Sequence, residues 1–415
     1  MKKKIISLFI ILTCLFSSFP FILAAQNLKL VSNYALEDPR NLFYLDNNVY
    51  VADGTNGLKI VNVGDPNNPQ DQGSYSVSGV CFDVFVAGDY AYLANGITGL
   101  QILDVSNPLL IDEMGSVVDS NYAWGVYVVD DYAYMADSDD GLEIIDVSDR
   151  ENPVEVAESS SGGYAEDVFV LDGYAYLAEK SQGMRIVNVT TPTSPTSLGV
   201  FNDGSDIYGV FVEGDYAYLA AHGSGLIVVD ISDKNSPSKV TNIAFDGMAR
   251  EIFVENKIAY VAARSEGLIL VNCTDLDTDL TVMAKLDDNS ETGSGDAGVY
   301  VADNYAYVVD QEKNSLQVID LTASGGGNIW LWILIPAILA VVVLIVRKST
   351  AKKEPSRKEK LSDEEVEEES NEDGEESAVV GIEESESEKE EIELKSIPEE
   401  AEDSQEKSEE SEQSE

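Results

Sequence analysis

The sequence has very little of the side-chain chemistry that most enzymes and metal sites use. Its 415 residues include one histidine, His222, and three cysteines. A single histidine excludes a multi-histidine metal cluster and any relay that needs a second imidazole. We therefore predict neither a bound metal nor a cofactor, and catalysis remains only an alternative.

Positive charge is also scarce. Lysine and arginine total 26, against 76 aspartates and glutamates, so the formal net charge is -50 at pH 7. Such a chain repels phosphate groups over most of its length. The composition therefore argues against nucleic acid and anionic lipid as partners.

A short apolar strand recurs at a fixed step of 42 residues. It follows a glycine in six copies, at Gly57, Gly99, Gly141, Gly183, Gly225 and Gly267, and a seventh copy follows Ser315. Unit two shows the other parts: a strand at 84–86, a Gly88-Asp89 turn, a second strand at 90–94, and a weaker fourth strand. Such a turn favours a hairpin, for which we expect type I′. Four antiparallel strands per repeat predict the blade of a β-propeller.

Two aromatic positions recur in all units. The first-strand set is Phe43, Phe85, Tyr127, Phe169, Phe211, Phe253 and Tyr300, and the second-strand set is Tyr50, Tyr92, Tyr134, Tyr176, Tyr218, Tyr260 and Tyr307. Large aromatic side chains supply much of the apolar contact in a core. We predict that both sets pack between neighbouring blades and bind no ligand.

The number of strands indicates how the ring closes. The chain has seven copies of strands one to three but only six internal copies of strand four. Residues 28–34, at the start of the mature chain, can supply the missing strand beside residues 316–321. Closure of this kind removes the exposed edges of an open array. Residues 28–321 are therefore predicted to form one all-β, seven-bladed propeller.

The third-strand motifs IVNV, ILDV, IIDV, VVDI and VIDL resemble the LVIVD repeat family, and the resemblance extends over all seven units. It implies a β-propeller on a bacterial or archaeal cell surface, in a family whose molecular function is mostly unassigned. Unit six departs from the motif at Cys273, and unit seven has Ser315 in place of the leading glycine. These departures affect the local loops rather than the fold.

The segments on either side of the repeats predict a membrane protein. Three lysines followed by an apolar run to residue 23 indicate a secretory signal. A second apolar run of 18 residues is long enough to span a bilayer, and the basic residues after it place that side in the cytoplasm. The predicted domains are a signal peptide at 1–25, the propeller ectodomain at 26–322, a Gly-rich spacer at 323–328, a transmembrane helix at 329–346, and a disordered acidic cytoplasmic tail at 347–415.

The two cysteines after the signal peptide and the glycosylation sequons have structural explanations. Cys81 and Cys273 replace small apolar residues of other units and lie in distant blades, so we expect free thiols in the core. Asn188 and Asn272 begin glycosylation sequons, but three other units have Asp104, Asp146 and Asp230 at that position. We predict that these asparagines cap the following turn, and their glycosylation remains open.

One position of the innermost strand varies while its neighbours stay nearly constant. It holds Arg40, Phe82, Trp124, Glu166, Tyr208 and Arg250, with Ala297 as the seventh. This position is expected to surround the mouth of the central channel, where His222 joins it from a loop. The two arginines can hold an anionic group between stacking aromatic rings. In the alternative interpretation they pair with Asp83, Asp167 or Glu251 and only seal the pore.

These patterns favour a cell-surface binding or adhesion propeller on a single membrane anchor, with an extracellular protein or glycan as its ligand. The alternatives are an extracellular hydrolase or lyase that uses the same mouth, and a structural component of the surface coat. Loops between strands two and three should share one face with the links between blades. The chain should leave the opposite face through a short spacer to the membrane span, so the mouth is expected to look away from the membrane. A cytoplasmic partner of the acidic tail is left open.

Overall fold

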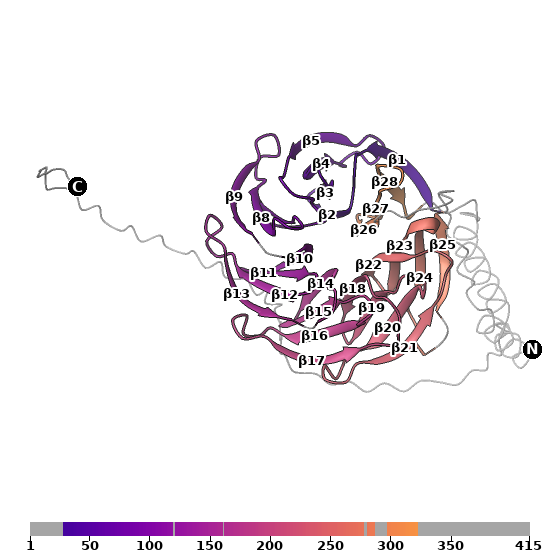
Figure 1. Cartoon of the computed structure of the whole chain (residues 1–415). Helices are drawn as coiled ribbons and strands as arrows, with labels where there is room; N and C mark the ends of the chain where they lie inside the picture. The colour runs from indigo at the N-terminus through magenta and orange to yellow at the C-terminus, as the bar shows by residue number, and fades with distance from the viewer. Residues whose placement is uncertain (1–27, 119–120, 161, 278–279, 287–296, 323–415) are drawn as a thin grey trace, which may run out of the picture. The chain divides into compact units, whose positions relative to one another are not determined.

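Seven four-stranded antiparallel sheets surround one axis in the computed structural model (Figure 1). The structure describes residues 28–322, except 119–120, 161, 278–279 and 287–296. The predicted signal peptide, spacer, membrane span and acidic tail lie outside the described residues. Within the described part of the chain, no helix has the length and hydrophobicity required to cross a bilayer.

The blades follow one another along the chain. Blade one consists of β2 (Asn41–Leu45), β3 (Asn48–Ala52), β4 (Leu58–Asn62) and β5 (Gln70–Tyr75). Blade two has β6 (Asp83–Ala87), β7 (Tyr90–Ala94), β8 (Leu100–Asp104) and β9 (Asp112–Val117), and blade three has β10 (Ala123–Val129), β11 (Tyr132–Asp137), β12 (Gly141–Asp146) and β13 (Val154–Ser159). Blade four has β14 (Asp167–Leu171), β15 (Tyr174–Ala178), β16 (Met184–Asn188) and β17 (Thr196–Phe201), and blade five has β18 (Gly209–Glu213), β19 (Tyr216–Ala220), β20 (Leu226–Asp230) and β21 (Ser238–Ile243). Blade six has β22 (Ala249–Glu255), β23 (Ile258–Ala263), the 3-10 turn η1 (Arg264–Glu266), β24 (Gly267–Asn272) and β25 (Thr281–Leu286). Blade seven has β26 (Ala297–Ala302), β27 (Tyr305–Asp310), β28 (Ser315–Asp320) and the N-terminal strand β1 (Lys29–Ala35).

The first and last segments of the propeller share one sheet, as the strand count predicts. β1 pairs antiparallel with β28, from Lys29 opposite Asp320 to Ala35 opposite Ser315. The two strands lie side by side in Figure 1. Leu36 then donates its backbone NH to the carbonyl of Asn314 at 2.7 Å. The ring is therefore closed by a strand from the start of the chain, and the predicted closure is confirmed.

Two-residue turns join the first and second strands of the blades. Asp46 and Asn47 both have positive φ, of 50° and 64°, as a type I′ turn requires. In the Gly88-Asp89 turn only Gly88, at 59°, lies in this region, which is the type II′ pattern. The predicted hairpin is confirmed there, although its turn type differs from the type I′ that we expected.

The core consists of seven apolar clusters, each between neighbouring blades. The second-strand tyrosines are only 0 to 6% exposed. Tyr176 of blade four, for example, packs against Ile207 and Val210 of blade five. Cys81 and Cys273 are buried free thiols in two of these clusters, as predicted. Burial of a side chain of this kind contributes about 1.5–3 kcal/mol, so repeated packing between blades supplies most of the stability.

The two faces of the ring have different loops. Isolated bridges join the loop between strands two and three to the link that enters the next blade, as in Lys180 with Ile207 and His222 with Ala249. We call this side the mouth face. On the other side, the hairpin face, the end of the third strand lies beside the hairpin turn, and Leu321 donates its backbone NH to Asn304 at 3.0 Å. The chain therefore leaves the propeller on the hairpin face.

The asparagines of the two sequons lie on the hairpin face and have the capping contacts that we expected. Asn188 Oδ1 accepts from the backbone NH of Thr190 at 3.0 Å, and Asn272 Oδ1 accepts from Thr274 at 2.9 Å. Asp230 makes the same contact with Ser232 in blade five at 2.8 Å. Asparagine and aspartate are thus interchangeable as turn caps at this position.

Removal of residues 28–34 should lower the Tm of the full-length protein. The deletion exposes the edge of β28 and removes partly buried apolar side chains, among them Tyr34. The loss should be about 3–6 kcal/mol, or about 10 °C in Tm. The Tm is measured by calorimetry, and a deletion of residues 354–415 serves as the control that leaves the closure intact. An unchanged Tm after removal of residues 28–34 would contradict this role for β1.

Candidate functional site at the channel mouth

The variable position of the repeat converges on the axis. Arg40, Phe82, Trp124, Glu166, Tyr208 and Arg250 all line one small pocket of about 60 Å³. We call this set the mouth ring. In blades three and six the strand register shifts at this position, between Ala123 and Gly125 and between Ala249 and Glu251. A bulge leaves one residue outside the ladder and redirects its side chain, which is how Trp124 and Arg250 can face the pocket.

A second ring lies immediately below. It consists of Asn41, Asp83, Gly125, Asp167, Gly209, Glu251 and Gly298, the next residue of each first strand. Asp83 accepts from the backbone NH of Val84 at 2.8 Å and from that of Val126, in the next blade, at 2.9 Å. Asp167 repeats this bridge with Val168 at 2.7 Å and Val210 at 2.8 Å. We call this set the polar ring, and Asp83 and Asp167 link neighbouring blades at the axis.

The glycines of the polar ring leave room for the first strand of the next blade. A Cβ on Gly209 would lie 2.8 Å from the carbonyl oxygen of Arg250, and one on Gly298 would lie 2.3 Å from Asn41 Oδ1. Acids and glycines therefore alternate, but seven positions cannot alternate completely. The exception is the neighbouring pair Asn41 and Asp83, in which Asn41 Nδ2 donates to Asp83 Oδ1 at 2.8 Å. An amide at position 41 thus replaces a repulsive contact between carboxylates by a hydrogen bond.

The first-strand aromatic residues form a continuous belt around the axis below the polar ring. Consecutive rings around the circle have centroids 4.7 to 5.3 Å apart, and Phe43 meets Tyr300 to complete it. These residues pack against the clusters between blades, as predicted, and they also line a cavity of about 360 Å³. The belt gives the channel an apolar floor.

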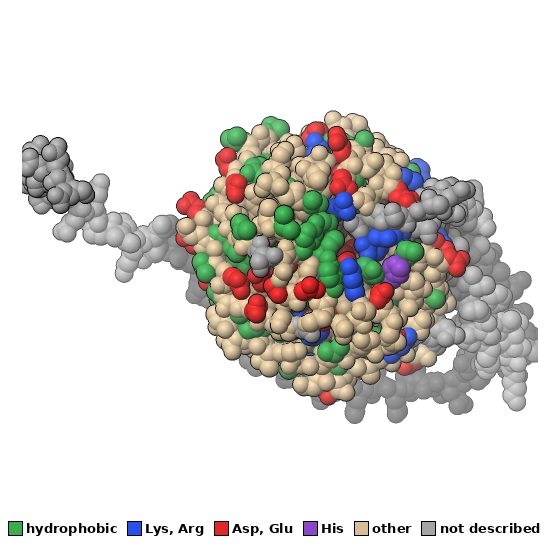
Figure 2. All heavy atoms as spheres, in the orientation of Figure 1, with side chains coloured by type: hydrophobic (Ala, Val, Ile, Leu, Met, Phe, Trp, Pro, Cys, Tyr) green, Lys and Arg blue, Asp and Glu red, His purple; other side chains and the backbone are tan. Residues whose placement is uncertain are grey.

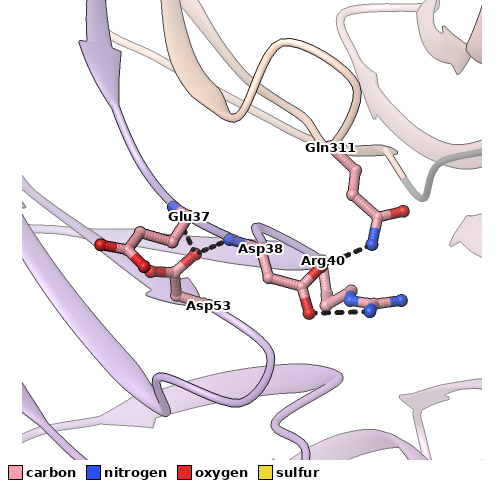
Figure 3. A network of polar contacts seen from close by, with 5 residues as sticks. All are labelled: Glu37, Asp38, Arg40, Asp53 and Gln311. Atoms are coloured by element: carbon pink, nitrogen blue, oxygen red, sulfur yellow. Dashed lines mark hydrogen bonds and ion pairs between the residues drawn. The ribbon is translucent and has the colours of Figure 1, made fainter.

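A network at the closure seam positions Arg40 (Figure 3). Asp53 Oδ1 accepts from the backbone NH groups of Asp38, at 2.7 Å, and Glu37, at 3.2 Å. Asp38 in turn accepts from Arg40 Nη2 at 2.8 Å and from Nε2 of Gln311, in blade seven, at 2.6 Å. Residues of blades one and seven therefore position Asp38, and Asp38 in turn positions Arg40.

Arg250 lies on the other side of blade seven. Its guanidinium lies over the ring of Tyr208, 4.0 Å from the centroid, and Nη1 is 3.9 Å from Glu166 Oε2. The imidazole of His222 contacts the same tyrosine, at 5.2 Å between centroids. His222 thus joins the mouth as predicted. Asp38 forms an ion pair with Arg40, and Glu166 lies near Arg250, whereas Asp83 and Asp167 accept from backbone NH groups in the polar ring. The charge of Arg250 also acts on Glu251.

Sequence reasoning missed Lys180 and Tyr164, two further residues of the mouth. The Lys180 ammonium contacts the carboxylate of Glu166 and lies over the ring of Tyr164, 3.8 Å from its centroid. A signal for Lys180 was present in the repeat. Lys180 and His222 have φ of 41° and 45°, at the loop position where blades one and two have glycine. A lysine at a glycine position is unusual enough to mark a candidate functional residue.

Comparison with known families agrees with this architecture. A model of the LVIVD repeat matches seven segments, at 40–77, 78–119, 120–159, 162–203, 206–244, 246–276 and 294–324. The chain belongs to the LVIVD repeat family. No curated protein matches it.

Solved structures resemble the LVIVD propeller in fold alone. The WD40 repeats of RRP9 are 10% identical, with a TM-score of 0.57 over 72% of this chain and 98% of that one. U3-55K is 10% identical, with a TM-score of 0.55 over 72% and 99% of the two chains. The computationally designed Ika8 protein is 8% identical, with a TM-score of 0.51 over 71% and 99%.

Burial dominates the electrostatics of the polar ring in this LVIVD protein. It raises the pKa of Asp83 to about 6 and that of Asp167 to about 7, although backbone donors oppose the shift. Burial also raises the pKa of Glu251 well above its ordinary value, and the charge of Asp167 raises it further. Burial lowers the pKa of His222, as do the charges of Arg250 and Arg264. Among the described residues, no group of three or more His, Cys, Asp or Glu could hold a metal ion.

The polar ring should make stability depend on pH. An acid with a raised pKa binds more protons in the folded state than in the unfolded state, so its contribution to stability falls as pH rises from about 4 to about 7. Glu251→Gln removes one such charge but keeps an oxygen that can accept from Ile252 NH, now 3.0 Å from Glu251 Oε1. We expect this variant to raise the Tm at pH 8 and to flatten the fall in Tm between pH 5 and pH 8.

The comparison between variant and wild type is decisive here, because the lowered pKa of His222 acts in the opposite direction. Glu155→Gln, on the exposed side of β13, is the matched control and should leave the slope unchanged. If Glu251→Gln also leaves the slope unchanged, the polar ring does not control the pH dependence.

Proposed function

We propose that this LVIVD protein is a cell-surface binding or adhesion propeller that holds an extracellular protein or glycan at its channel mouth. The observation that carries the proposal is the mouth ring. Its six large side chains are of five different kinds, although the blades that carry them have the same four strands. Packing between blades does not require this variety. Selection for a ligand at the mouth accounts for it.

The chemistry of the mouth suits recognition of a polar surface. Phe82, Trp124 and Tyr122 form a cluster with ring centroids 4.3 to 5.3 Å apart, and Arg40 lies over Phe82 at 5.5 Å. Figure 2 shows hydrophobic side chains, basic side chains and the single histidine together near the axis on this face. Aromatic residues and arginine are the side chains that contribute most to binding at protein interfaces.

In this proposal the flanking segments display the propeller. The signal peptide at 1–25 directs export, the span at 329–346 anchors the chain, and the acidic tail at 347–415 stays disordered in the cytoplasm. The chain leaves the propeller on the hairpin face, at Leu321. A spacer from there to residue 329 reaches at most about 25 Å. We infer that the hairpin face looks toward the membrane and the mouth looks away from it.

A glycan and peptide array is the direct test of binding. We expect the full-length protein, in neutral detergent, to bind specific array members, and the double variant Arg40→Ala/Arg250→Ala to lose at least about tenfold in affinity. The matched control is Lys239→Ala/Lys257→Ala, which removes two positive charges from an outer strand and a hairpin turn. Both variants are first compared by Tm.

The array also separates the alternatives. Binding that survives in Arg40→Ala/Arg250→Ala would place the site elsewhere. Chemical conversion of a bound glycan or peptide would instead favour the hydrolase or lyase. No binding to any member, together with ordered assembly on the cell, would favour a coat component.

The topology makes a separate prediction. An epitope tag placed at the C-terminus should resist protease on intact cells and be digested after the cells are permeabilised, because the basic residues after the span retain the tail in the cytoplasm. A second tag placed after residue 26 should be accessible to antibody on intact cells. Digestion of the C-terminal tag on intact cells would contradict the proposed orientation.

A further inference from the structure

Lys180 occupies a site built from the side chains of three blades. Its ammonium is 3.8 Å from the centroid of Tyr164, 5.6 Å from that of Tyr208 and 5.7 Å from that of Trp124. The fourth contact is the carboxylate of Glu166. Three aromatic rings and one carboxylate thus surround a single cation, and we call this site the aromatic cage.

The walls of the cage are held in place independently of Lys180. Trp124 Nε1 donates to Ser138 Oγ and is within hydrogen-bond distance of the Tyr164 hydroxyl, both at 3.0 Å. Tyr208 is covered on one side by Arg250, which also lies near Glu166. Removal of the lysine side chain would therefore leave the four walls with their other contacts.

Lys180 itself comes from a loop whose backbone favours glycine. Its φ is 41°, a left-handed conformation that is unfavourable for lysine and readily adopted by glycine. Blades one and two have Gly54 and Gly96 at this position. The lysine is therefore not needed to make the loop, and its side chain is what distinguishes blade four.

We propose that Lys180 is an internal occupant of the cage and that the ligand at the mouth presents a trimethylammonium group that displaces it. Aromatic walls attract a cation through their negative faces, and a quaternary ammonium suits them because it has no N–H donors to satisfy. The side chain of Lys180 is 29% exposed and can swing toward solvent, while Glu166 is only 9% exposed and retains a cation partner when the ligand enters. This inference rests on the proposed function only in placing the ligand at the mouth.

An internal occupant lowers the apparent affinity for a ligand in proportion to the fraction of time for which the site is empty. Lys180→Gly removes the occupant and installs the residue that blades one and two have here. In calorimetric titration of the full-length protein, we expect choline to bind this variant at least about tenfold more tightly than wild type, as follows if Lys180 fills the cage about nine-tenths of the time. Addition of Tyr164→Leu should abolish the gain.

The controls separate a cage for cations from a hydrophobic pocket. 3,3-Dimethylbutan-1-ol has the shape of choline without its charge and should not bind Lys180→Gly. Lys234→Met removes a lysine that lies over Tyr174 on the hairpin face, and it should not gain affinity for choline. Phosphocholine as a separate titrant distinguishes a free cation from the same group in an esterified head group. If Lys180→Gly proves unstable by Tm, Lys180→Asn replaces it, since asparagine tolerates left-handed φ.

The proposal is overturned if choline binds the Lys180 variants no more tightly than wild type, or if the neutral isostere binds equally well. Arg40 and Arg250 are unchanged in these proteins. Array binding that persists without choline binding therefore rejects the cage alone. The array experiment with Arg40→Ala/Arg250→Ala is a separate test, and it concerns the mouth as a whole.

Discussion

The pairing of β1 with β28 is the contact on which the rest of the propeller depends. Each blade buries its apolar side chains only against the next blade, so an open row would leave two faces without partners. A strand from the start of the chain completes the last sheet and brings blade seven against blade one. The same seam contains the Asp38 network, which positions Arg40 at the mouth. Closure and the candidate site are therefore coupled.

The odd number of blades has a direct chemical consequence at the axis. Carboxylates at Asp83, Asp167 and Glu251 are tolerable near the axis because glycines separate them and because backbone NH groups meet them. The donors include one in the next blade for Asp83 and for Asp167, and Ile252 of the same strand for Glu251. Alternation fails once in a ring of seven, and Asn41 takes that position. The axis can thus carry polar groups without placing two carboxylates side by side, and the mouth ring above is left to differ from blade to blade.

Much of the candidate site was accessible from the period of the repeat. Trp124 and Tyr208 could be placed on one ring because residues 42 apart occupy equivalent places in successive blades. The repeat places Lys180 at the loop position of His222, but it does not show that the Lys180 side chain meets Tyr164, since both come from loops whose paths depend on the neighbouring blade. The bridges of the polar ring were out of reach for a similar reason: Asp83 and Asp167 accept from backbone groups of the next blade, which adjacency in the sequence does not reveal.

The sequence by itself determined the blades, their number, the closing strand and the identity of the mouth ring. These follow from local rules, because turn chemistry, alternation and the repeat length act within about one unit of the chain. Only the tertiary structure decided which carboxylate meets which arginine, and that Lys180 enters an aromatic cage. Those contacts join blades that are separate in sequence, and bulges and left-handed loop residues set their geometry. They form only once the ring has closed and the blades face a common axis.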